Sequence, residues 1–183
     1  MRNSYVENLV KTVIEASESD TWECAVTEWD IVDCTEDSSC DSTCVCRKEN
    51  LRYKYTIRNH RTGKFLFPIG SSCIHKFGRE DLDNQTSVME QMFRLLHAVK
   101  DNRYLSFSSD LFSRKLLLWF YNHGVFDTKY NNYHGYNDYE FMLKMYNKRN
   151  KDLITPAQDR KIKAILLGSI KPYLQKTLKN KIS

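Results

Sequence analysis

Four cysteines lie within residues 34–46, and another returns at position 73 after a hairpin-like segment. Cys44 and Cys46 are separated by one residue, so a single turn can present both thiols, and Cys73 can fold back onto that turn. Thiolates that converge from two segments are typical ligands of tetrahedral Zn²⁺. The sequence therefore predicts a zinc site formed by Cys40, Cys44, Cys46 and Cys73.

The fourth ligand has alternatives, because Cys34, His60 and His75 also lie in or near this stretch. Four thiolates would close the coordination shell, which indicates a structural rather than a catalytic ion. The competing interpretation is a set of buried thiols without metal. Cys24, in an extended segment, is expected to be a small core residue.

The N-terminal segment and the hydropathy of the chain bear on its cellular compartment. Residues 1–5 contain no apolar leader, and no stretch is long and apolar enough to span a bilayer. We therefore expect a cytoplasmic protein, in the host-cell cytoplasm if phage-encoded, with no membrane partner. Disulfides are disfavoured in that compartment, which leaves metal binding or burial for the six cysteines.

Hydrophobic periodicity predicts an α+β protein. Apolar residues at helical spacing predict a helix over residues 4–17, and residues 22–34 favour a strand. Strict alternation over residues 51–58 predicts a strand with one buried and one basic face. Residues 64–69 return as a second strand, in which Pro68 indicates a sheet edge.

The rest of the chain has a helical pattern, beginning with a capping-box sequence at Ser87. A further helix is expected to open at Asp110, and Thr155-Pro156 with Gln158 predicts another helix start. Pro172 should kink or interrupt that last helix. We expect residues 1–80 to form an N-terminal helix with a zinc-stapled antiparallel sheet, and residues 81–183 to form a helical domain packed on it.

The net charge of +5 conceals an asymmetry along the chain. Residues 1–50 hold twelve acids and four bases, whereas residues 51–183 hold eleven acids and twenty-four bases. A basic field suits a phosphate backbone or an acidic protein surface. The alternative is that the two parts neutralise each other or that the lysines form a solvated face.

The candidate binding residues for nucleic acid or a partner form two basic groups. Those on the hairpin are Arg52, Lys54, Arg58, Arg61 and Lys64, and those near the last helix are Lys148, Arg149, Arg160, Lys161 and Lys163. Arg and Lys neutralise phosphates.

An acidic segment precedes the cysteine loop. Its members are Glu28, Asp30, Asp33, Glu36, Asp37 and Asp41. They are expected to be solvated or to balance the charge of the basic hairpin. In a sharper hypothesis, they mimic the phosphates of a nucleic acid.

Two parts of the sequence resemble proteins of phages and mobile elements. Cys44-Val-Cys46, Tyr53–Asn59, Thr62-Gly63 and Ile69-Gly70-Ser-x-Cys73-Ile74-x-x-Phe77 resemble a small zinc-ribbon-like module. Phe141, Asn147-Lys-Arg149 and Leu153-x-Thr-Pro-x-Gln158 resemble the helical tail that accompanies it. The resemblance implies a zinc module and a phage-like setting without implying an activity.

These observations favour a non-enzymatic accessory protein that binds nucleic acid or a host nucleoprotein complex. In a phage-like setting the target would be a host machine such as a CRISPR effector or a polymerase, which would make the chain an inhibitor of host defence (an anti-CRISPR). The alternative is a metal-dependent nuclease that uses His60 near the cysteines. A purely structural assembly protein is a third possibility, which predicts stable oligomers.

Overall fold

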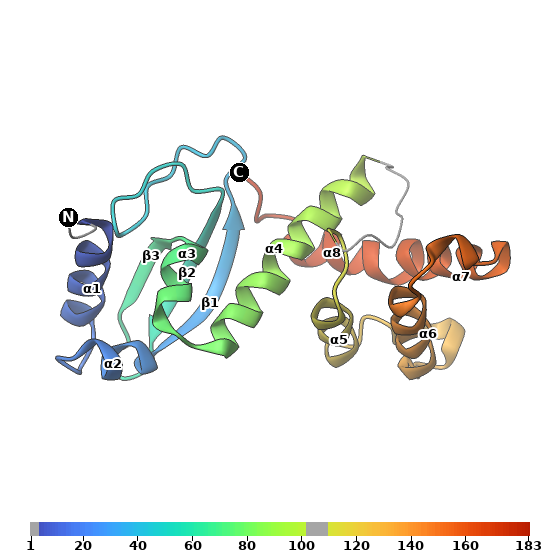
Figure 1. The fold of residues 1–183 in the computed structure, drawn as a ribbon, viewed down its shortest axis with the longest axis horizontal. Coiled ribbons are helices and arrows are strands. Elements are labelled where there is room, and N and C mark those ends of the chain that lie inside the picture. Colours follow the sequence, from blue (N-terminus) through green and yellow to red (C-terminus); the bar gives the residue numbers. More distant parts are fainter. Residues whose placement is uncertain (1–3, 102–109) are drawn as a thin grey trace. The chain divides into compact units, whose positions relative to one another are not determined.

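The computed structural model describes residues 4–101 and 110–183, and it divides into two compact units. Unit 1 comprises Met1–Ser87 with Asn180–Ser183, and unit 2 comprises Val88–Lys179. The boundary falls inside helix α4 (Glu80–Lys100), later than the position expected from sequence, and the last residues belong to unit 1. The predicted α+β class, with an N-terminal helix, an antiparallel sheet and a helical C-terminal half, is confirmed (Figure 1).

Unit 1 is built on a three-stranded antiparallel sheet in the order β1-β2-β3. Its strands are β1 (Trp29–Glu36), β2 (Tyr53–Asn59) and β3 (Phe65–Ile69). The alternation predicted for the second strand is confirmed, because Tyr55 and Ile57 are fully buried whereas Arg58 is exposed. β3 is an edge strand, as Pro68 indicates.

Several short elements surround the sheet. Helix α1 (Ser4–Ala16) buries Leu9 and Val13. The Tyr55 hydroxyl donates to the carbonyl of Thr86 over 3.2 Å, which ties the inner face of the sheet to the first part of α4. The hairpin is followed by α3 (Ser71–Ile74) and a 3₁₀ turn, η2 (His75–Phe77).

The strand predicted for residues 22–34 is wrong in its first part. Residues 22–28 instead form α2 (Trp22–Ala25) and a 3₁₀ turn, η1 (Val26–Glu28), and the strand begins at Trp29. Apolar residues do not alternate strictly before Trp29, so no extended ladder is favoured there. The Thr27 hydroxyl donates to the carbonyl of Cys24 over 2.7 Å, a local bond that favours a helical turn.

The end of the chain lies beside β1, where Figure 1 shows it next to the strand. Ile182 forms a parallel bridge with Glu36, and Ser183 N–H donates to the Glu36 carbonyl over 2.9 Å. Lys181 pairs with Asp33 over 2.5 Å. These contacts cover part of an edge that would otherwise expose unpaired backbone groups.

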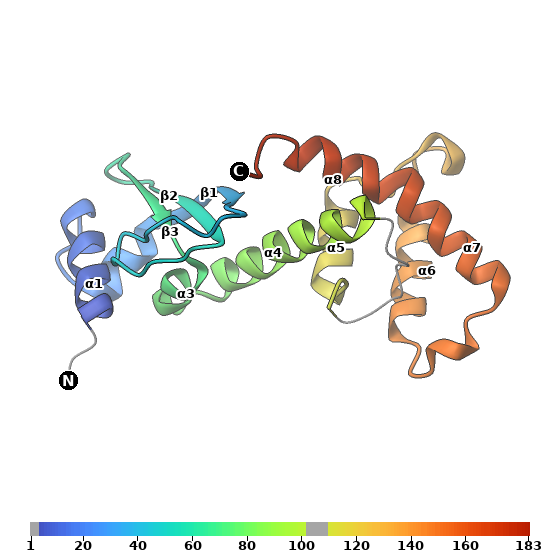
Figure 2. The same cartoon turned by 90° about the horizontal axis from the view of Figure 1, so that it is seen from above.

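Unit 2 is helical (Figure 2). Its helices are the later part of α4, then α5 (Arg114–Asn122), α6 (Tyr136–Asn147), α7 (Pro156–Ile165) and α8 (Lys171–Leu178), with 3₁₀ turns η3 (Lys129–Asn131) and η4 (Lys151–Leu153). Within the described residues, no helix is both long enough and apolar enough to cross a membrane.

The helix starts of unit 2 agree only in part with expectation. The capping box at Thr155 and Gln158 is confirmed. The predicted start at Ser87 is wrong, since α4 begins at Glu80, shortly after Gly78 ends the preceding turn with φ 66°. α5 is capped by the hydroxyl of Ser113 rather than opened by Asp110.

Pro172 is accommodated without ending the helical path. A π-helical segment, η5 (Leu166–Ile170), joins α7 to α8, in which Pro172 occupies the first turn. A proline there costs little because the first N–H groups of a helix have no partner within it. The π-helical segment η5, just before Pro172, is the interruption of the last helix that the sequence predicted.

The buried carboxylate of Glu28 joins the segment after α1 to the end of β2. Glu28 accepts the backbone N–H groups of Glu18 and Ser19, each over 2.9 Å, and the Asn59 amide over 2.8 Å. Burial acts to raise the pKa of Glu28, but the bonds from Ser19, Asn59 and the two backbone groups outweigh it and lower this pKa to about 2.

We predict that Glu28→Gln lowers the free energy of unfolding by about 1–3 kcal/mol, because the amide presents donors to backbone donors. The ionised Glu28 stabilises the fold above the ordinary pKa of 4.5, and this contribution is lost as the pH falls towards about 2. Urea unfolding at a series of pH values measures both effects, with Glu15→Gln as an exposed control. A Glu28→Gln protein with unchanged stability at pH 7 would contradict this role.

Candidate metal centre

The loop between β1 and β2 is shaped by Asp37. Its carboxylate accepts from the hydroxyl and backbone N–H of Ser39 and of Ser42, at distances of 2.5–3.2 Å. The bonds from Ser42 and Ser39 hold the pKa of Asp37 well below its usual range. Sequence reasoning treated Asp37 only as an acidic residue, although an Asp followed by nearby serines is a known signal for such local turns.

A tight turn presents the first two thiols. The N–H of Arg47 donates to the Cys44 carbonyl over 2.7 Å, and Arg47 has a φ of 75°. The N–H of Val45 donates to the Pro68 carbonyl over 2.9 Å, which fastens the turn to β3. From α1, the Asn8 amide donates to the Cys46 carbonyl over 3.2 Å.

The third thiol comes from α3, directly after the hairpin, as predicted. The Sγ atoms of Cys44, Cys46 and Cys73 all lie within 4.8 Å of one another, and all three residues are buried. Cys44 Sγ and Cys73 Sγ are 3.7 Å apart. Two sulfurs on a tetrahedral zinc, each at about 2.3 Å from the ion, would be separated by about 3.8 Å. The donor set and this spacing therefore fit a metal ion.

The backbone at Gly70 completes the surroundings of the sulfurs. Its N–H donates to Cys44 Sγ over 3.4 Å, a type of contact that orients and stabilises thiolate ligands. A Cβ at this position would lie 2.9 Å from Leu51 Cδ2, so a larger residue would require the end of the Leu51 side chain to move. The sequence offered Gly70 only as part of a turn.

The thiols cannot all lose their protons without a neighbouring cation. The hydrogen bond between the Cys44 and Cys73 sulfurs lowers the pKa of Cys44 to about 5. The same contact, with burial and the Cys44 charge, raises the pKa of Cys73, and burial raises the pKa of Cys46. A bound dication would favour the thiolate form of all three.

The fourth ligand predicted from sequence is not part of this group. Cys40 has a φ of 57°, and its Sγ lies 3.6 Å from the Asp37 carbonyl. Cys34 is buried in β1 opposite Tyr55. Among the described residues, the group of converging ligands comprises Cys44, Cys46 and Cys73, so a fourth protein ligand stays a prediction.

Neither histidine proposed as a substitute ligand lies in the thiol group. His60 Nδ1 is 3.4 Å from a carboxylate oxygen of Asp30, and His75 Nδ1 is 2.5 Å from one of Asp83. Both side chains are about half exposed.

The structure pairs much of the basic hairpin with the acidic segment. Arg52 Nη2 lies 2.9 Å from the buried carboxylate of Glu36, and Lys54 Nζ lies 3.7 Å from Asp37. β1 and β2 are antiparallel neighbours, which brings the two oppositely charged segments together. For these residues the balancing interpretation describes the contacts better than a mimic of nucleic acid.

The other hairpin cations have different surroundings. Arg61 lies 3.8 Å from Glu18, and the Lys64 amine donates to the Glu15 carbonyl over 3.3 Å. The Arg58 guanidinium lies over the Phe65 ring, 5.8 Å from its centroid.

The basic residues of unit 2 also differ in their surroundings: the lysines have partners, whereas the two arginines contact no described carboxylate. Lys161 pairs with Asp138 over 3.0 Å, and Lys163 pairs with Asp159 over 2.6 Å. Lys148 donates to the Leu153 carbonyl and to Gln158. Arg149 and Arg160 are exposed, and neither contacts a carboxylate within the described part of the chain.

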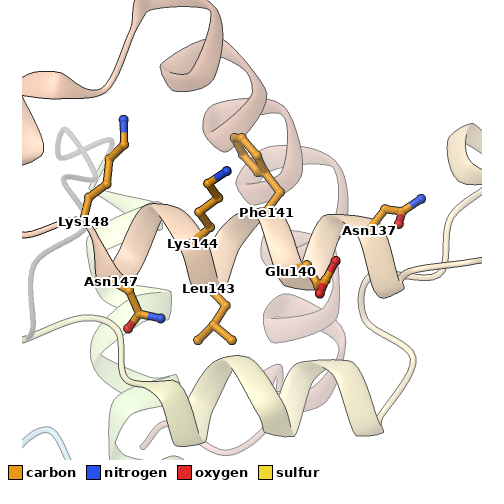
Figure 3. Close-up of a pocket in the computed structure, with 7 residues that line it drawn as sticks. All are labelled: Asn137, Glu140, Phe141, Leu143, Lys144, Asn147 and Lys148. Carbon is orange, nitrogen blue, oxygen red and sulfur yellow. The ribbon is translucent and has the colours of Figure 1, made fainter.

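A surface depression of about 650 Å³ runs along α6 (Figure 3). Its lining residues are Asn137, Glu140, Phe141, Leu143, Lys144, Asn147 and Lys148. All belong to α6 or directly follow it, and Figure 3 shows Leu143 and Lys144 extending to different sides of the helix. The depression does not gather groups from several elements as a catalytic site does.

Comparisons with protein-family models, with curated proteins and with solved structures gave no match to this chain. The fold and the site themselves define the class of protein: it is an α+β protein with a buried three-cysteine group that could hold a metal ion.

We predict about one Zn²⁺ per chain when the protein is produced with zinc, because three converging thiolates bind zinc strongly. Cys44→Ser or Cys73→Ser should reduce the content to below about a tenth of an ion and lower the thermal unfolding midpoint. Elemental analysis and calorimetry measure both. Cys24→Ser is the matched control, because Cys24 is exposed in α2 and is not the core residue expected from sequence. A metal-free wild type with the same midpoint as its Cys44→Ser variant would contradict the centre.

Proposed function

We propose that this chain is a non-enzymatic binding protein for nucleic acid, alone or within a nucleoprotein complex. Zn²⁺ held by Cys44, Cys46 and Cys73 would have a structural role in it. The observation that carries the proposal is the convergence of buried thiols from both flanks of a charged hairpin. An ion at that position ties the start of β2 to the end of β3 and fixes the surface between them.

Burial of the ligands supports a structural ion. Cys44, Cys46 and Cys73 are at most 6% exposed, so a substrate would have little access to a metal among them. Catalytic zinc sites keep an open position for water or substrate. The alternative of a nuclease that uses His60 gains little support, because His60 pairs with Asp30 and lies outside the thiol group.

The distribution of charge supports a polyanionic partner. Arg58, Arg149 and Arg160 are exposed and form no ion pair with a described carboxylate. Unpaired guanidinium groups are well suited to phosphates, because they offer several donors and keep their charge. Inhibition of host defence, through a CRISPR effector or a polymerase, is a narrower form of the proposal and rests on the sequence resemblance alone.

We predict salt-sensitive binding of labelled oligonucleotides, measured by fluorescence anisotropy, and no cleavage when Mg²⁺ or Mn²⁺ is added. Replacing Arg149 and Arg160 together by Gln should lower the slope of log affinity against log salt by about 1.5, since each lost phosphate contact removes about 0.7–0.9. Replacing Lys161 and Lys163 by Gln is the matched control, because carboxylates already neutralise these lysines.

Two results would contradict the proposed function. The first is the absence of affinity for every single-stranded and duplex DNA and RNA tested at low salt. The second is metal-dependent cleavage that is lost in the His60→Ala variant, which would favour the nuclease.

A further inference from the structure

Two phenylalanines of β3 face solvent. Phe65 and Phe67 are 59% and 54% exposed, although phenylalanine is among the residues most often buried. They are alternate residues of one strand, so both side chains lie on the same face of the sheet. The opposite face holds the buried Tyr55 and Ile57, and Ile69 joins them because the register of β2 and β3 shifts between Tyr55 and Ile57.

A cation accompanies the exposed rings. Arg58 is paired with Phe65 in the register of β2 and β3, and its guanidinium lies 5.8 Å from the Phe65 centroid. Within the described residues Arg58 forms no ion pair with a carboxylate. Lys64 directly precedes Phe65, so its side chain leaves the strand on the other side, where its amine donates to the Glu15 carbonyl of α1.

The acids on the same face are already neutralised. Asp30 lies 3.4 Å from both Arg79 and His60, and Asp33 pairs with Lys181. The positive charge of Arg58 therefore dominates beside the rings, and this combination favours an anionic partner with flat faces over a neutral apolar one.

Strand β3, which carries the two rings, is held by β2 and by the cysteine turn. β3 pairs with β2, and the Pro68 carbonyl accepts from Val45 in the cysteine turn. Cys73 follows β3 directly and contributes to the thiol group. A metal at that group would hold the exposed rings in fixed positions, which lowers the entropic cost of binding.

We propose that Arg58, Phe65 and Phe67 form a stacking platform for single-stranded nucleic acid. Bases would stack on the two rings, and Arg58 would contact a phosphate. This inference rests on the proposed function and adds the class of nucleic acid and the site.

The spacing of the rings favours single strands. Alternate residues of a strand lie about 6.6 Å apart, whereas successive bases of a duplex strand are about 3.4 Å apart and cover each other's faces. Only an extended single strand can present separated, uncovered bases at the wider interval.

The test uses the full, zinc-loaded chain with fluorescein-labelled dT₂₀ and U₂₀, and a duplex of the same length as competitor. Phe65→Ala with Phe67→Ala should weaken binding about 25-fold or more, because each lost stacking contact costs about five-fold or more. This double variant should leave the salt slope unchanged, whereas Arg58→Gln should lower it by about 0.7. Tyr130→Ala, at an 85% exposed aromatic of unit 2, is the control.

A second variant gives a direct readout of stacking. Phe65→Trp should retain affinity, and its added tryptophan fluorescence should be quenched when dT₂₀ binds. Circular dichroism and zinc content, unchanged in each variant, would show that the fold is intact.

The outcomes separate the two proposals. Equal affinity of the wild type and the double Phe variant would overturn the platform while leaving nucleic-acid binding intact. Preference for the duplex would overturn the single-strand assignment. Failure of the wild type to bind any oligonucleotide would overturn both, and a protein partner would then be the better explanation of the exposed rings.

Discussion

The mutual proximity of three buried sulfurs is the constraint on which the β unit depends. Cys44, Cys46 and Cys73 cannot share a small volume as thiolates unless a cation offsets their repulsion. Two of these residues precede the hairpin and one follows it. A single ion would therefore close a loop that contains β2 and β3, and would fix both the twist of the hairpin and the exposed surface of β3.

Many charged residues of unit 1 form ion pairs between neighbouring segments of that unit. An acidic β1 lies beside a basic β2, so Glu36 meets Arg52 and Asp37 meets Lys54, whereas Asp30 pairs with Arg79, which lies just before α4. Ion pairs at the surface contribute little each, but here the Glu36 carboxylate is buried and would be costly to leave without its arginine. Binding of a partner must then use the cations that remain, which are few and separate.

The sequence predicted the parts of this structure that depend on local patterns. The alternation after Leu51, the cap at Thr155 and the return of Cys73 towards Cys44 all follow from periodicity and spacing. The start of α4 and the short helix at Trp22 were missed, because weak helical signals there are decided by tertiary contacts. The pairing of Arg52 with Glu36 was beyond local reasoning, since it depends on strand register.

The return of residues 180–183 to β1 affects how the protein is made. The helical unit is synthesised between the sheet and the segment that pairs with the end of its β1 edge. During translation, β1 therefore emerges from the ribosome long before its outer backbone groups acquire their partners. Nascent chains would carry an open strand edge through that interval, and this exposes them to chaperone capture or mispairing until residues 180–183 arrive.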